Sequence, residues 1–219
     1  MSSRYLGPVI KYVRENNEMS LSTLSEKSQI SESYLDLYEQ ALIHSNFAME
    51  RELCKALEIS TEDLLNLREY ARPSWVEIGL TFAHTIAERS SDNKHRVGAC
   101  ILSNQSHIPL SFGYNGRAPG EPNQRESQVQ GKSGFLHAEE NALLLAGGRW
   151  SEGEKHTLFC THEPCDLCAR RILRVGKISR VVFSQIYVDD WRESQGLPFG
   201  RDILRSGGVE VFQVSFGKY

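Results

Sequence analysis

The spacing of hydrophobic residues predicts a chain built from two different parts. In the first third, apolar positions recur every three or four residues, as they do on one face of an amphipathic helix. Short polar breaks separate these stretches, and Ser20, Ser31 and Thr61 stand where helix N-caps are expected. We therefore predict a compact bundle of five short helices, over residues 5–13, 21–24, 34–42, 47–57 and 64–67.

A second pattern begins near Pro73, which would interrupt a continuing helix. A helical pattern leads into two strand patterns joined by a short polar turn, as in a hairpin. After a polar stretch from 115 to 134, helix and strand patterns alternate to the end of the chain. The predicted helices are 75–90, 137–146, 165–175 and 201–206, and the predicted strands are 97–103, 108–114, 157–161, 180–184 and 209–214. This alternation predicts an α/β fold with helices covering a sheet, so we divide the chain into domains 1–72 and 73–219.

Composition narrows the class of protein without identifying it. The 219 residues carry a net charge of −3, which disfavours a general attraction to nucleic acid or to a membrane surface. No apolar run has the length of a membrane span and no signal-peptide pattern opens the chain, so we expect a soluble cytoplasmic protein. The five cysteines do not indicate a disulfide framework. The 115–134 stretch is longer than an ordinary connection, and such loops are usually functional or mobile.

Two short motifs on successive predicted helices carry the candidate chemistry. His137-Ala138-Glu139 opens one helix, and Pro164-Cys165-x-x-Cys168 opens the next, with one predicted strand between them. Helix N-termini carry partial positive charge and favour thiolates. One imidazole and two thiolates give zinc three protein ligands and leave its fourth tetrahedral position for water, the pattern of a catalytic site. Glu139 lies close enough to exchange protons with that water, whose pKa zinc lowers.

Each of these residues also has a plainer interpretation. A Cys-x-x-Cys pair is often half of a structural zinc site or a redox pair, although four thiols and a thioredoxin pattern are missing here. His137 alone could be a hydrogen-bonded core histidine, and Glu139 alone a surface acid that complements the helix dipole. The joint occurrence in this order favours a deaminase, because His-x-Glu with Pro-Cys-x-x-Cys is the signature of zinc deaminases.

The amino-acid sequences of these motifs resemble those of the cytidine and deoxycytidylate deaminase superfamily. The segments that carry the resemblance are His137-Ala-Glu-Glu-Asn-Ala-Leu, Thr161-His-Glu-Pro-Cys-Asp-Leu-Cys-Ala, Val97-Gly-Ala-Cys-Ile-Leu and Gly113-Tyr-Asn-Gly116. The last two are similar to the deoxycytidylate branch. The resemblance implies a cytidine-deaminase-like α/β/α arrangement around a five-stranded mixed sheet, bound Zn²⁺, a homo-oligomer that is commonly a hexamer, and conversion of dCMP to dUMP.

The same resemblance points to substrate-binding residues. It implies that Asn115 lies near the substrate sugar, that Lys94 and Arg96 contact the phosphate, and that Tyr187 packs near the sugar. Asn115 could instead belong to a simple turn, the two cations could be solvated loop charges, and Tyr187 could be ordinary edge packing. The chain reads Asn115-Gly-Arg-Ala-Pro-Gly, with proline one place later than in the family, which leaves the loop geometry and any dCTP or dTTP regulation open.

Further cations occur in the long polar stretch itself. Arg117, Arg125 and Lys132 could close over a nucleotide as a lid and hold its phosphate.

The N-terminal helices resemble the helix-turn-helix of the Cro/repressor family over about residues 9–67. Residues 1–72 nevertheless carry 8 Lys and Arg against 12 Asp and Glu. We expect the helix that would contact bases to expose Glu32, Asp36 and Glu39, where Arg, Gln or Asn would be needed. Duplex binding also needs positive charge against phosphates. We therefore expect this bundle to contact protein, with DNA binding as the alternative.

Three functions compete at this point. The first is a deaminase of a free cytosine deoxynucleotide, with dCMP as the first candidate. The second is a polynucleotide deaminase of the tRNA adenosine type, which would need a basic face for its substrate. The third is a transcriptional regulator that senses nucleotides through a deaminase fold, although a sensor has no need of the proton-transfer residue Glu139.

Overall fold

The computed structural model describes residues 6–67, 70–129 and 132–215 of the chain. It divides into two compact units, Met1–Ile78 and Gly79–Tyr219. The division falls inside one helix, α6 (Trp75–Ala87). Among the described helices, none combines the length and the hydrophobicity that a membrane-spanning segment requires.

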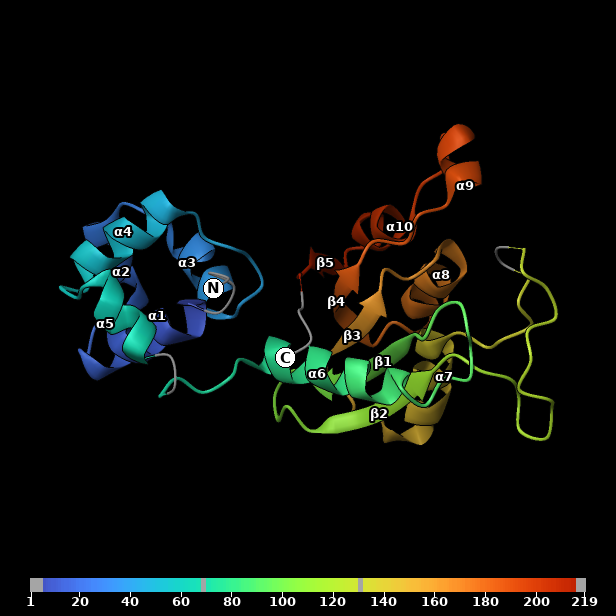
Figure 1. The fold of residues 1–219 in the computed structure, drawn as a ribbon. Coiled ribbons are helices and arrows are strands. Elements are labelled where there is room, and N and C mark those ends of the chain that lie inside the picture. The colour runs from blue at the N-terminus through green and yellow to red at the C-terminus, as the bar shows by residue number, and fades with distance from the viewer. Residues whose placement is uncertain (1–5, 68–69, 130–131, 216–219) are drawn as a thin grey trace. The chain divides into compact units, whose positions relative to one another are not determined.

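The N-terminal unit is a helical bundle, seen in blue and cyan in Figure 1. Before α6 it contains α1 (Leu6–Asn16), α2 (Leu21–Ser28), α3 (Glu32–Glu39), α4 (Phe47–Ala56) and α5 (Thr61–Asn66). Each of the last four begins at a side-chain cap, where an oxygen accepts a backbone N–H that the helix leaves unpaired. These caps are Ser20, Ser31, Asn46 and Ser60.

Two expectations about this bundle need correction. The cap of α5 is Ser60, not Thr61, because the Ser60 hydroxyl accepts the Asp63 N–H and Thr61 is already helical. Glu39 does not lie on an exposed surface. It is buried, and its carboxylate accepts two hydrogen bonds from Arg14, at 2.7 and 2.8 Å. The pair joins α3 to α1, so this acid stabilises the bundle interior and faces no ligand.

The second unit is built on a mixed five-stranded sheet in the order β2-β1-β3-β4-β5. Its strands are β1 (Gly98–Ser103), β2 (Pro109–Tyr114), β3 (His156–His162), β4 (Ile178–Gln185) and β5 (Glu210–Gln213). β1 pairs antiparallel with β2 and with β3, whereas β3, β4 and β5 are parallel. The hairpin and the alternating pattern read from the sequence are confirmed.

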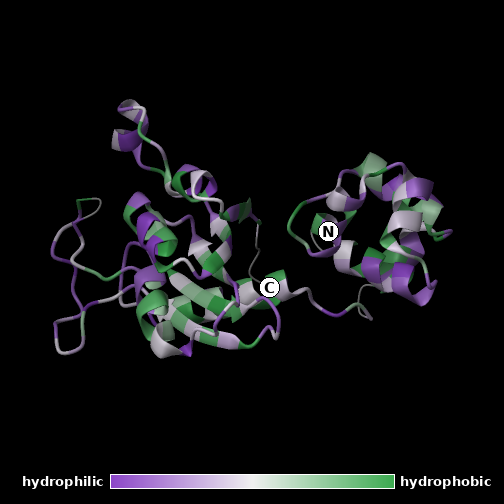
Figure 2. Cartoon of the chain, turned by 180° about the vertical axis from the view of Figure 1, so that it is seen from behind, coloured by the Kyte–Doolittle hydropathy of each residue, from purple (hydrophilic) through white to green (hydrophobic). Residues whose placement is uncertain are grey.

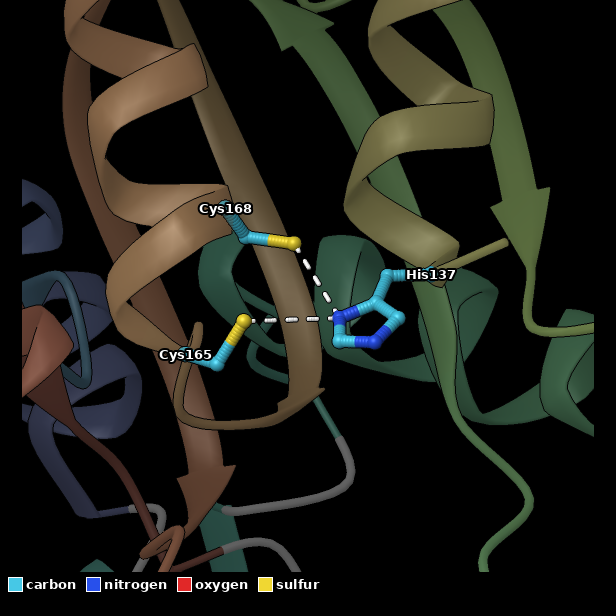
Figure 3. A group of neighbouring side chains, drawn as sticks. All are labelled: His137, Cys165 and Cys168. Atoms are coloured by element: carbon cyan, nitrogen blue, oxygen red, sulfur yellow. Dashed lines mark hydrogen bonds between the residues drawn. The ribbon is translucent and has the colours of Figure 1, made fainter. Parts of the chain in front are cut away.

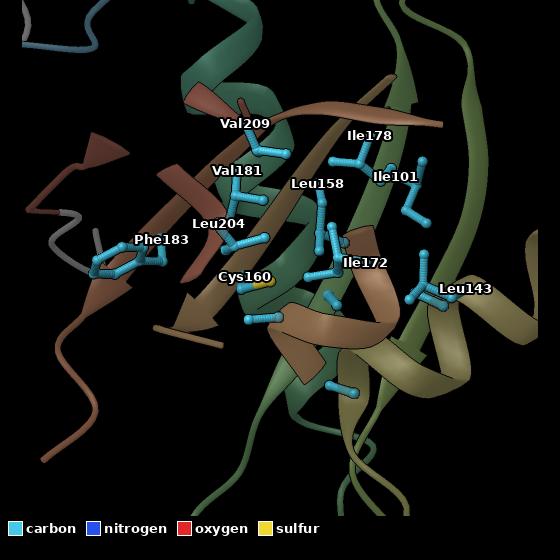
Figure 4. Close-up of a cluster of buried hydrophobic side chains, with 14 of the residues drawn as sticks. Ile101, Leu143, Leu158, Cys160, Ile172, Ile178, Val181, Phe183, Leu204 and Val209 are labelled. Carbon is cyan, nitrogen blue, oxygen red and sulfur yellow. The ribbon is translucent and has the colours of Figure 1, made fainter. Parts of the chain in front are cut away.

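Helices cover both faces of this sheet (Figure 1). Alternate residues of β3 point to opposite sides. Leu158 and Cys160 join a buried cluster with α7 (Ala138–Ala146), α8 (Asp166–Val175) and α10 (Gly200–Ser206), part of which Figure 4 shows. Phe159 faces α6 on the other side, against Gly79.

Small residues allow two of these helices to approach the sheet closely. A Cβ at Gly98 would overlap the Ala83 carbonyl oxygen of α6, and a Cβ at Gly113 would overlap the Ala138 carbonyl oxygen of α7. Glycine at both places therefore lets helix backbone lie directly on strand backbone. The second contact matters for the site, since α7 begins beside it.

The remaining segments connect these layers. Residues 115–134 contain no helix or strand within their described part, and the only bridge at that loop joins Gly116 to Leu136. This loop appears largely hydrophilic in Figure 2. A short helix that the sequence pattern did not predict, α9 (Asp190–Ser194), follows β4, and a 3-10 turn, η3 (Gly147–Arg149), follows α7.

Candidate active site

The starts of α7 and α8 bring three potential metal ligands together. His137 is the residue immediately before α7, Cys165 is the residue immediately before α8, and Cys168 lies in the first turn of α8. The His137 Nδ1 atom is 3.4 Å from the Cys165 Sγ and 3.3 Å from the Cys168 Sγ (Figure 3). The three ligand atoms all lie within 4.8 Å of one another.

These spacings fit a tetrahedral zinc ion. Zn–N bonds of about 2.0 Å and Zn–S bonds of about 2.3 Å at tetrahedral angles place N and S about 3.5 Å apart, close to the 3.4 and 3.3 Å found. Among the described residues no other group of three or more His, Cys, Asp or Glu side chains has ligand spacing. A closed structural site with four protein ligands is therefore not formed here, and a coordination position is left for another molecule.

The three side chains of the cluster shift one another's pKa values through hydrogen bonds. A hydrogen bond from Cys168 and one from His137 lower the pKa of Cys165 to about 4. The reciprocal hydrogen bond with Cys165 raises the pKa of His137 to about 9, and the same partner raises the pKa of Cys168. The partial positive charge of the helix N-terminus also favours this thiolate, and a thiolate is the form of cysteine that binds a metal ion.

Glu139 is the buried acid beside this cluster. It is the second residue of α7 and is only 4% exposed. Burial raises the pKa of its carboxyl to about 7, and the nearby His137 opposes that shift. An acid with a pKa near neutrality can both accept and return a proton, which is what a general acid–base group requires.

A pocket of about 400 Å³ opens onto this centre. It contains six of the eight site residues predicted from the sequence, and these are Lys94, Asn115, His137, Glu139, Cys165 and Tyr187. Cys168 is fully buried and is not among the pocket residues. Arg96 does not line the pocket. It is exposed and pairs with Glu88 at 3.3 Å.

Asn115 is held at the pocket wall by its own hydrogen bonds. Its Oδ1 accepts the Val97 N–H at 2.8 Å, and its Nδ2 donates to the His95 carbonyl at 2.8 Å and to Asp92 at 3.1 Å. Both amide hydrogens are therefore used within the protein. An asparagine side chain can in general offer a ligand both a donor and an acceptor, but here only a lone pair of Oδ1 is left for a substrate hydroxyl.

Asp92 organises the turn that carries Lys94 and His95. The carboxylate is 3% exposed and accepts the Lys94 N–H at 2.8 Å, the Asn115 amide and the Arg125 guanidinium. Burial alone would raise the pKa of Asp92, but the hydrogen bonds outweigh it and leave that pKa below its ordinary value. Neither Asp92 nor its pairing with Arg125 was predicted, because 33 residues separate the two in sequence.

The three cations of the polar stretch have different surroundings. Arg125 lines the pocket, paired with Asp92 and lying over the Phe135 ring. Arg117 is bound instead to Glu121, Glu126 and the Gly134 carbonyl. Neither Arg117 nor Lys132 is among the pocket residues.

Two further pocket residues, His162 and Glu163, stand just before the Pro164-Cys165 motif. The buried Glu163 carboxylate accepts hydrogen bonds from the Arg201 backbone N–H at 3.2 Å and its guanidinium at 2.7 Å. This contact ties the loop before Cys165 to the start of α10. Both residues lie inside the quoted motif, so the signal was present, but nothing in the sequence indicated their partners.

Comparisons with known proteins agree with this geometry. Residues 73–185 match the family described as "Cytidine and deoxycytidylate deaminase zinc-binding region". A deoxycytidylate deaminase from Saccharomyces cerevisiae is 36% identical over 155 residues, which are 66% of this chain and 46% of that protein. The chain thus spans about half the length of that relative. One from Mycobacterium phage D29 is 33% identical over 128 residues, 52% of this chain and 96% of that protein.

A solved structure shows the same fold. The crystal structure of dCMP deaminase from the cyanophage S-TIM5 in complex with dCMP and dUMP superposes with a TM-score of 0.50 at 30% identity, and covers 63% of this chain and 94% of that one. The mixed sheet with flanking helices is therefore the cytidine-deaminase-like fold expected from the sequence. The family match covers more than half of the chain and includes the whole metal cluster, and the chain belongs to the cytidine and deoxycytidylate deaminase zinc-binding family.

Proposed function

We propose that this chain is a zinc-dependent deaminase of free cytosine deoxynucleotides, with dCMP as its substrate. The reaction takes dCMP and water to dUMP and ammonia. The observation that carries the proposal is the buried Glu139 carboxyl beside three convergent metal ligands, inside a pocket of about 400 Å³. The dCMP and dUMP complex of the cyanophage enzyme and the names of the relatives support this choice of substrate.

His137, Cys165 and Cys168 would hold the zinc ion. When bound, zinc acts as a Lewis acid that makes water a stronger nucleophile at neutral pH. Glu139 then accepts a proton from the water that attacks C4 of the cytosine ring. The same carboxyl passes this proton to the ring nitrogen N3, and then carries the proton of the new C4 hydroxyl to the leaving amine, so that ammonia departs and the carbonyl of uracil forms.

The sugar and phosphate would extend away from the metal along the pocket. Asn115 can accept a hydrogen bond from a sugar hydroxyl through Oδ1, and Tyr187 lines the same pocket. Lys94, also at the pocket, is the better candidate of the two predicted phosphate ligands. Arg96 would have to leave Glu88 and change position to reach a bound nucleotide.

The N-terminal bundle has a separate proposed role. Its α2 and α3 are joined by a short turn, as in the helix-turn-helix that the sequence resembles. The excess of acidic residues favours a contact with protein, in assembly of a homo-oligomer or in regulation, over a contact with DNA.

A cytoplasmic location follows from a free nucleotide as substrate.

A panel of substrates tests the proposal. Zinc-loaded protein is supplied with dCMP, CMP, dCTP, deoxycytidine and a tRNA substrate, and ammonia release is measured with and without dCTP and dTTP as effectors. We expect dCMP to have the highest kcat/KM. Turnover of tRNA alone would favour the polynucleotide deaminase, and nucleotide binding without any turnover would favour the regulator.

A further inference from the structure

His162 is a pocket residue for which the proposed reaction provides no role. It is the last residue of β3 and lines the same pocket as Asp92 and the metal ligands His137 and Cys165. Its ring meets the His95 ring edge to face, with centroids 6.2 Å apart. His95 belongs to the same turn as Lys94, so His162 lies beside that turn.

The hydrogen bonds of Thr161 determine where the His162 ring carries its proton. The Thr161 Oγ1 accepts the Gly98 N–H at 3.1 Å and lies 3.1 Å from the His162 Nδ1. Thr161 is buried, and among the described residues the Nδ1 is the only acceptor placed to receive its hydroxyl hydrogen. A buried hydroxyl left without an acceptor is costly. Nδ1 must therefore accept, and the proton of a neutral ring stands on Nε2.

The ring remains neutral at physiological pH. Burial, followed by the nearby His95 and His84, lowers the pKa of His162 to about 4. In the described part of the chain, the bond at Nδ1 is the only hydrogen bond of the ring. The Nε2–H group is thus a donor that the protein leaves to whatever fills the pocket.

The position of this donor indicates which part of a nucleotide it meets. The base must reach Glu139 and the metal ligands, whereas His162 contacts His95, the chain neighbour of Lys94, which is the cation proposed for the phosphate. A phosphate oxygen is the strongest hydrogen-bond acceptor of a nucleotide. We propose that Thr161 fixes His162 as the Nε2–H tautomer and that this N–H donates to a phosphate oxygen of the bound nucleotide, which makes His162 a specificity residue for monophosphates. This inference rests on the proposed function.

The first test requires no turnover. Zinc-loaded protein with ¹⁵N-labelled histidine is studied by NMR, and the His162 resonances are assigned by their loss in His162→Gln. We expect Nε2 to be protonated and Nδ1 to be unprotonated. Addition of dUMP should shift the Nε2 resonance, whereas deoxyuridine should leave it nearly unchanged. The opposite tautomer, no shift with dUMP, or equal shifts with both ligands would overturn the proposal.

A matched pair of variants tests the consequence for catalysis. Glutamine can place an amide N–H near the position of Nε2, whereas asparagine places it near Nδ1. For dCMP we expect His162→Gln to retain most of kcat/KM and His162→Asn to lose about 10–100-fold, as for one hydrogen bond to a charged group. Deoxycytidine turnover should change little in either variant. Equal losses for dCMP and deoxycytidine would refute the phosphate contact. A wild-type protein inactive on every nucleotide would refute the proposed function, and the NMR result would still decide the tautomer and the contact.

Discussion

The three potential metal ligands can bind an ion only because the fold brings them together. Cys165 and Cys168 share the start of α8, and His137 reaches them from the start of α7, 28 residues earlier in the chain. Replacing Cys165 with Ser or His137 with Ala should abolish stoichiometric zinc, because two remaining protein ligands hold it far less tightly. Metal analysis of purified protein checks this prediction.

The control for that prediction is another buried thiol of the same unit. Cys100→Ala changes a cysteine on β1 that belongs to no metal cluster among the described residues. It should retain one zinc per chain. Tight zinc binding that survives the loss of Cys165 or His137 would show that the site is elsewhere.

Asp92 gives a prediction at the residue scale about pH. Its pKa is below the ordinary value in the folded protein, so the ionised carboxylate stabilises the fold above the unfolded pKa of about 3.9. That stabilisation is lost as pH falls through the folded pKa. Asp92→Asn should lower the free energy of unfolding at pH 7 by about 1–3 kcal/mol, because Arg125 loses its charged partner.

Urea denaturation at several pH values measures this effect. The difference between wild type and Asp92→Asn should narrow as pH approaches about 4 and below, since protonation then removes the same charge from the wild type. If the two proteins have the same free energy of unfolding at pH 7, or if their difference grows in acid, the pairing of Asp92 with Arg125 is contradicted.

At the scale of elements, the site depends on how closely α7 lies on β2. A methyl group at Gly113 would overlap the Ala138 carbonyl at the start of that helix. Gly113→Ala should therefore displace His137 and Glu139 together, destabilise the protein by about 1–3 kcal/mol as overpacking does, and weaken zinc binding. Gly148→Ala is the control, because its Cβ would meet open space. Equal zinc affinity in both variants would show that the contact between α7 and β2 does not position the metal ligands.

The elements also show how far the sequence could predict this structure. Hydrophobic periodicity predicted every strand and the helices that flank the sheet, because those patterns record which face is buried. It missed α9, a five-residue helix whose Asp189 cap is its clearest signal. It misplaced the start of α5, because Ser60 and Thr61 are adjacent residues that can both cap a helix.

The site was predicted unevenly for a related reason. The metal ligands and Glu139 stand in local motifs, so spacing along the chain was enough to identify them. Asp92, Arg125 and the Glu163–Arg201 pair join distant segments, and their contacts exist only once the loop and α10 are folded. For Asn115, the residue type gave its hydrogen-bonding groups but not the partners that already occupy them.

At the scale of the whole molecule, charge limits what the N-terminal bundle can bind. Residues 1–72 have 12 acidic against 8 basic residues, and Glu32 and Asp36 are exposed on α3. The full-length protein should bind duplex DNA only weakly at moderate salt, since few cations are available to neutralise phosphates. Gel shifts with fragments of the native operon measure this. A nanomolar, sequence-selective complex would favour a repressor over a protein contact.

The most direct test of the proposed deaminase activity compares wild type with Glu139→Gln at equal zinc content. Conversion of dCMP to dUMP is followed by ammonia release and chromatography. We predict that wild type turns over dCMP. Glu139→Gln should keep one zinc per chain and still bind dCMP. Its kcat should fall by about 10²–10⁴-fold, the usual contribution of a general acid–base group. A kcat of Glu139→Gln within about tenfold of the wild-type kcat would contradict the role of Glu139 in proton transfer. A zinc-loaded wild type that leaves dCMP unchanged would contradict the proposed deaminase activity.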